Sequence, residues 1–200
     1  HGTDNTPAAE INLQSYVDHI LQIIDELPDS VVLVAHSGNG TVASAVAEQR
    51  PARIEKLIYL AAYLVQSGQS FFDLYVHDKD SLLPHNSSID ADAGTHMINR
   101  DIYQQALYLD CPAEIEELAA NLLTPEPNLP RTEAITLTDA NYGSVPRYYI
   151  ECLQDNAVSL SLQRLMQKAM PCKQVNSLNS SHSPFFSQPQ ALVDCMLSFA

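Results

Sequence analysis

The sequence has few basic residues: 10 Lys and Arg stand against 24 Asp and Glu, which leaves a formal net charge of −14. Nucleic-acid backbones and anionic membranes both favour Lys and Arg, so this charge argues against either as a partner. Long hydrophobic runs are absent too. The longest, Leu57 to Val65, is far short of the ~20 residues that a membrane-spanning helix needs. We therefore expect a cytoplasmic protein, with a homodimer as one possible assembly.

The sequence also lacks the cysteine and histidine spacings of metal sites. None of its four cysteines forms a C-x-x-C pair, and His77, His85 and His96 have no ligand spacing with Cys or carboxylates. We therefore expect no metal, and four free thiols that behave as small hydrophobic residues. The cysteines are Cys111, Cys152, Cys172 and Cys195.

What is present is a regular alternation of helical and strand-like segments. Apolar residues recur at helical spacing over 12–27, 40–49, 158–170 and 189–199, where Ser187 is the expected N-cap of the last helix. Short apolar runs cover 31–34, 56–64 and 147–153, and 172–178 is a weaker candidate for a fourth strand. Such runs are typical of strands that are covered on both faces. The alternation predicts an α/β fold with a mostly parallel sheet flanked by helices.

One segment interrupts this alternation. Residues 66–137 contain helical patches at 102–109 and 113–123 but no strand of the buried type. An insertion between two core strands is most simply a helical cap over one end of the sheet. We therefore divide the chain into a first core part (1–65), a cap insertion (66–137) and a second core part (138–200).

The candidate nucleophile is Ser37, in the stretch "SVVLVAHSGNGT" that covers 30–41. A strand that turns sharply into a helix exposes its apex residue, and this turn needs small residues on either side of the apex. The usual pattern is G-x-S-x-G. Here Ala35 and Asn39 replace the two glycines, and Asn tolerates a left-handed backbone better than other non-glycine residues. The alternative interpretation is that Ser37 is only a helix cap.

A serine nucleophile needs a histidine to accept its proton and a carboxylate to orient that histidine. Asp155 follows the strand at 147–153, and His182 lies in a polar loop before the last helix, so both should reach the same sheet edge as Ser37. His36 is instead expected to be a packed structural residue that points away from the turn. The acidic residues of the insertion and its exit are expected to be surface carboxylates or caps; they are Asp80, Asp110 and Asp139.

The oxyanion of an acyl-transfer intermediate needs two backbone N–H donors. The Gly38 amide, directly after the nucleophile, is the expected first donor. The second should come from a loop after an early strand, but the 36 residues before Ser37 contain no such strand or glycine-rich loop.

Four stretches together resemble the α/β-hydrolase superfamily, in the branch of plant methyl esterases, hydroxynitrile lyases and bacterial esterase-like relatives. They are "LVAHSGNG", "KLIYLAAYL", "LTDANYGSVPRYYIECLQDNAV" and "SSHSPFFSQPQALVDCML". The resemblance implies a core sheet with a helical cap, no cofactor, and Ser37, Asp155 and His182 at the triad positions. The family also has N-terminal strands with an "HG" loop that gives the second oxyanion donor. Either this part precedes residue 1, or the protein has lost half of its oxyanion hole and an edge of its sheet. We expect the former, because deleting early strands would leave apolar strand edges unpaired.

From these patterns we expect a serine hydrolase that cleaves small, largely apolar carboxylic esters through an acyl-enzyme. In the lyases of this branch a lysine follows the catalytic histidine. Ser183 follows His182 here, which favours ester hydrolysis over hydroxynitrile lyase activity. The alternative from another class is an inactive hydrolase scaffold that binds a small ligand, which Asn39 and the absent donor loop favour.

Overall fold

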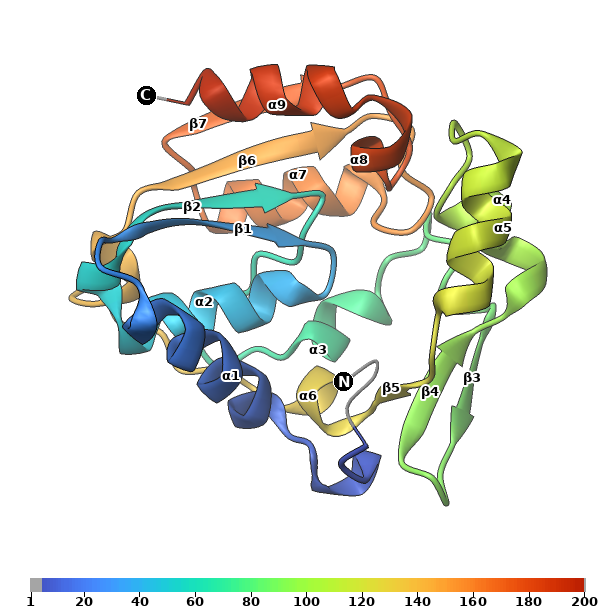
Figure 1. The fold of residues 1–200 in the computed structure, drawn as a ribbon, viewed down its shortest axis with the longest axis horizontal. Helices are drawn as coiled ribbons and strands as arrows, with labels where there is room; N and C mark the ends of the chain where they lie inside the picture. The colour runs from blue at the N-terminus through green and yellow to red at the C-terminus, as the bar shows by residue number, and fades with distance from the viewer. Residues whose placement is uncertain (1–4, 200) are drawn as a thin grey trace.

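The computed structural model describes residues 5–199 and places a four-stranded parallel sheet at the centre of the molecule (Figure 1). The strand order is β1-β2-β6-β7, and each neighbouring pair is parallel. The strands of this sheet are β1 (Val31–His36), β2 (Ile54–Leu60), β6 (Arg147–Cys152) and β7 (Gln174–Leu178). The predicted α/β fold with a mostly parallel sheet flanked by helices is confirmed.

Helices cover both faces of the central strands β2 and β6, which explains their buried apolar runs. On β1, by contrast, Val32 and Val34 are exposed, so the expectation that both faces of this strand are covered was wrong. On β2, Leu57 and Tyr59 belong to the core that includes α1, α2 and α7, whereas Ile58 and Leu60 pack with residues of α9. The helices are α1 (Leu13–Glu26), α2 (Asn39–Gln49), α7 (Leu160–Ala169), α8 (Pro184–Ser187) and α9 (Pro189–Leu197). None of the described helices is long and apolar enough to cross a membrane.

Two sequence predictions about element ends were wrong. The second strand was expected to continue to Leu64, but β2 ends at Leu60 because Ala61 adopts a left-handed backbone with φ 40°. Ser187 was expected to cap the last helix. It is instead the final residue of α8, and Gln188 stands at the N-terminus of α9 without a side-chain cap.

The segment between β2 and β6 combines short helices with a second sheet at one side of the molecule (Figure 1). Its helices are α3 (Phe71–Tyr75), α4 (Tyr103–Ala106), α5 (Ala113–Leu122) and α6 (Leu129–Thr132). Its strands, β3 (Ser87–Asp90), β4 (Thr95–Ile98) and β5 (Glu126–Pro127), form an antiparallel sheet that the sequence did not predict. The boundaries 1–65, 66–137 and 138–200 stay a prediction.

Candidate active site

The turn between β1 and α2 holds Ser37 in a strained conformation. Its φ of 56° lies in the left-handed region, which non-glycine residues rarely adopt and which often marks a functional site. The surrounding backbone maintains this conformation. The Ser37 carbonyl accepts hydrogen bonds from the amides of Tyr63 (3.0 Å) and Gly40 (3.2 Å), and the Ser37 amide donates to Leu60 (3.4 Å).

The two positions Asn39 and Gly40, which follow in the turn, differ in what the backbone requires of them. A Cβ atom built on Gly40 would lie 2.2 Å from the carbonyl oxygen of Tyr63, so the close approach of α2 to the segment after β2 requires glycine. Asn39 is not in the left-handed region. The position that is glycine in the usual pattern therefore places no conformational demand on Asn39, and the expected left-handed tolerance of Asn is not used.

The amide that follows Ser37 is free to donate. Gly38 stands at the N-terminus of α2, and its N–H has no hydrogen-bond acceptor within residues 5–199. An amide at this position, next to a nucleophile and at the positive end of a helix, is suited to bind a developing oxyanion.

Asp155 and His182 form a buried pair. The Asp155 Oδ2 atom lies 2.7 Å from His182 Nδ1, and both side chains are almost fully buried. The other carboxylate oxygen accepts the amides of Ala157 (2.7 Å) and Val158 (2.9 Å), which fixes its orientation. With Nδ1–H directed at Asp155, Nε2 is the ring nitrogen available as a base.

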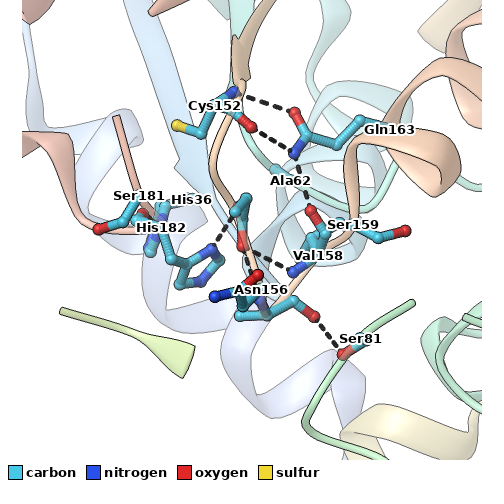
Figure 2. Close-up of polar contacts among 12 residues, drawn as sticks. His36, Ala62, Ser81, Cys152, Asn156, Val158, Ser159, Gln163, Ser181 and His182 are labelled. Atoms are coloured by element: carbon cyan, nitrogen blue, oxygen red, sulfur yellow. Dashed lines mark hydrogen bonds and ion pairs between the residues drawn. The ribbon is translucent and has the colours of Figure 1, made fainter. Parts of the chain in front are cut away.

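His36 links the nucleophile turn to the histidine loop. Its Nε2–H donates to the backbone carbonyl of His182 at 2.8 Å, and the two ring centroids are 4.3 Å apart (Figure 2). Burial and the neighbouring His182 lower the pKa of His36 to about 3, so the ring is neutral at ordinary pH. His36 is therefore a packed residue, as expected, but it faces His182 and does not point away from the site.

Ser37 lies close to the His182 loop, because the adjacent residue His36 donates a hydrogen bond to the His182 carbonyl. Within the described part of the chain, the Ser37 hydroxyl makes no hydrogen bond to His182. Catalytic hydrogen bonds are often long before substrate binds and shorten only in the complex.

At the sequence level, one residue near the pair, Gln163, was missed, and another, Asp110, was assigned the wrong setting. Gln163, on α7, is fully buried and bonds both backbone groups of Cys152 as well as the carbonyl of Val158, so it holds the loop that carries Asp155 (Figure 2). Asp110 is not the simple surface carboxylate that was expected, because it accepts a hydrogen bond from Ser181 beside His182. Neither has a local signal in the sequence.

A cavity of about 1280 Å³ lies beside the turn. It is bounded by α1, the edge of β1, α2 and the second sheet, and His36 and Asn39 are among its lining residues.

All four cysteines are free thiols. Among residues 5–199, no group of three or more His, Cys, Asp or Glu side chains could hold a metal ion.

Comparison with known proteins gives consistent matches. The model of the "Alpha/beta hydrolase family" matches residues 1–195. Putative methylesterase 11, chloroplastic, of Arabidopsis thaliana is 32% identical over 200 residues, which cover 94% of this chain and 51% of that protein. The chain thus spans about half the length of the first curated relatives that it matches.

Solved structures share the fold. The methylesterase protein MES16 from Arabidopsis superposes with a TM-score of 0.80 at 24% identity, covering 98% of this chain and 81% of that one. A pyrethroid hydrolase from Sphingobium faniae JZ-2 superposes with a TM-score of 0.86 at 22% identity, covering 98% and 81%.

Proposed function

Because the chain belongs to the alpha/beta hydrolase family, as its resemblance to the plant methylesterase branch predicted, we propose that it hydrolyses small, largely apolar carboxylic esters through Ser37, His182 and Asp155. The observation that carries the proposal is the left-handed Ser37 at a strand-to-helix turn, beside a buried His–Asp pair. Relatives named as methylesterases support an ester as the substrate class.

The geometry suits a two-step acyl transfer. The Ser37 hydroxyl attacks the ester carbonyl carbon while His182 Nε2 takes its proton, and the Gly38 amide binds the resulting oxyanion. Collapse of this intermediate breaks the bond to the alcohol, which leaves with the proton from His182. Water, deprotonated by His182, then attacks the acyl-enzyme; the bond from the acyl carbon to the Ser37 oxygen breaks, His182 returns the proton to that oxygen, and the carboxylic acid leaves. Asp155 holds the His182 tautomer and stabilises its cation throughout.

The first test is labelling of the full-length protein with a fluorophosphonate, followed by digestion and mass spectrometry. We expect an adduct on the Ser37 peptide of the wild type and none in Ser37→Ala, together with a loss of ester hydrolysis of at least about 10³-fold. A well-folded wild type without an adduct would refute the esterase proposal.

The second candidate is an inactive hydrolase scaffold that binds a small ligand, favoured by the absence of a Ser37–His182 hydrogen bond within residues 5–199. The labelling experiment distinguishes the two.

Hydroxynitrile lyase activity is a minor alternative, since the buried Ser183 follows His182 and no lysine does. Cyanide release from a cyanohydrin would be its evidence. The cytoplasmic location stays a prediction.

A further inference from the structure

Residues of the inserted segment contact the loop that carries His182 on both sides of the histidine. It runs from the end of β7 to the start of α8, and Ser180, Ser181 and Ser183 are as buried as His182 itself. A loop of small polar residues has few apolar contacts of its own to fix its backbone. Its position must therefore come from hydrogen bonds.

Besides the bond from His36 to the His182 carbonyl and the amide bond from Gln154 to the Ser180 carbonyl, contacts on both sides of the histidine come from one step of the chain, Asp110–Cys111, between α4 and α5. The Ser181 hydroxyl donates to Asp110 Oδ1, and Cys111 Sγ lies 3.8 Å from the carbonyl oxygen of Ser183. Gln188 Nε2 is 3.4 Å from the second Asp110 oxygen and donates to the Asn179 carbonyl at 2.8 Å. Ser181 and Ser183, directly before and after His182, thus contact the adjacent residues Asp110 and Cys111, respectively.

The Asp110 carboxylate is suited to this contact. Burial raises the pKa of the Asp110 carboxyl, but hydrogen bonds, above all from Ser181, together outweigh this effect and hold the pKa below its usual value. Hydrogen bonds to an ionised acceptor are roughly twice as strong as neutral ones. The contact also joins residues 71 positions apart in the sequence, so it constrains the loop from outside.

We infer that Asp110 is a positioning residue for His182. Through Ser181 it fixes the position of the histidine loop, so that the His182 imidazole lies between the Asp155 carboxylate and Ser37. Asp110 touches no reacting atom and acts through the loop. The inference rests on the proposed function for the role of His182, but the contacts themselves do not depend on it. Figure 2 shows Ser181 and His182 as neighbours on this loop.

The test compares Asp110→Ala, Ser181→Ala and the double variant in the full-length protein. Asp80→Ala is the matched control, because Asp80 Oδ2 accepts a 2.6 Å hydrogen bond from Ser161 on α7, a similar insertion-to-core contact away from the His182 loop. One readout is the rate constant for phosphonylation of Ser37. The other is the downfield proton NMR signal of the His182 Nδ1–H bonded to Asp155, which needs no catalysis.

We expect Asp110→Ala and Ser181→Ala each to slow phosphonylation by about tenfold to hundredfold, since small misplacements of catalytic groups cost this much. The double variant should be no slower than the worse single one, because both remove one contact. Asp80→Ala should stay within twofold. Asp110→Asn, which keeps an acceptor oxygen, should recover part of the rate. The NMR signal should shift or broaden in Asp110→Ala and Ser181→Ala but persist in Asp80→Ala and Ser37→Ala.

Rates and NMR signals that match those of Asp80→Ala would overturn the inference, and so would single effects that multiply in the double variant. If Asp110→Ala does not fold, Ser181→Ala and Asp110→Asn decide the question by the same criteria. If the wild type itself is not phosphonylated, the proposed function fails, and the NMR signal alone then decides whether Asp110 positions His182.

Discussion

His36 is a histidine that the folded protein keeps neutral. Its Nε2–H is committed to the His182 carbonyl, and burial together with His182 lowers its pKa to about 3. His96 is a second such group, with a pKa lowered to about 4 by burial and by Arg131. In the unfolded chain both histidines should take up protons near their ordinary pKa of about 6.5. The unfolded state therefore binds more protons than the folded state between these values.

This difference predicts a loss of stability as pH falls from about 6.5 toward 3. Each histidine contributes a slope of up to about 1.4 kcal/mol per pH unit, because stability rises with pH where the unfolded state holds the extra proton. Removing one titrating group, as in His36→Gln, should make the pH dependence of the free energy of unfolding shallower by up to this amount. Urea titrations at several pH values between 7.5 and 4 measure it.

The control is His85→Gln, at an exposed position. It removes an exposed histidine and leaves His36 in place, so the slope should not change. An equal change of slope in both variants would contradict the assignment of the effect to the burial of His36.

At the scale of elements, the start of α2 and the chain after β2 depend on each other. The left-handed Ala61 ends β2 and turns the chain so that the backbone of Tyr63 crosses the first turn of α2, where its amide bonds Ser37. The close approach at Gly40 is the consequence. The conformation of the candidate nucleophile is thus set by the packing of one helix on the segment after the neighbouring strand.

Gly40→Ala should consequently be destabilising. The added methyl group would overlap the Tyr63 carbonyl, and relief requires a backbone shift that costs about 1–3 kcal/mol or more. Gly143→Ala is the control, because the atoms nearest to its Cβ lie at 3.4 Å. Chemical denaturation gives both free energies of unfolding. Similar losses in the two variants would show that contact with Tyr63 is not the cause.

At the scale of the whole molecule, β1 lies at one edge of the sheet that the described strands form. Among the described strands, only β2 pairs with β1, and the side chains of Val32 and Val34 on β1 are 46% and 43% exposed. An exposed apolar edge strand is a template for pairing with another chain. The net charge of −14 opposes such association through repulsion between molecules.

We expect the 200-residue chain to self-associate as its concentration rises, and Val34→Lys to reduce this association by placing a charge on the edge. Sedimentation velocity over a concentration series measures it. Leu165→Lys adds the same charge at an exposed position of α7 and makes the net charge less negative by the same amount as Val34→Lys. It should therefore not reduce association. A similar reduction by both variants would mean that the β1 edge is not the site of contact.

The sequence by itself determined the order of elements and the candidate triad. Periodic apolar spacing, runs covered on both faces, and a serine between a strand and a small-residue helix are local patterns, readable from neighbouring residues. Ser37, Asp155 and His182 were proposed as the triad because each follows a predicted strand of one parallel sheet, and such strands deliver their following residues to a shared edge.

Only the tertiary structure decided the features that join distant residues. The attachment of Ser181 to Asp110, the bridge from Gln163 to the Asp155 loop and the contact of His36 with His182 have no local signature, because they arise when separate elements pack. The strands β3 and β4 were missed for a related reason: they are four residues each and mostly polar or partly exposed, so their pairing, not their pattern, makes them strands. Local chemistry specifies the elements, and packing specifies how precisely they meet.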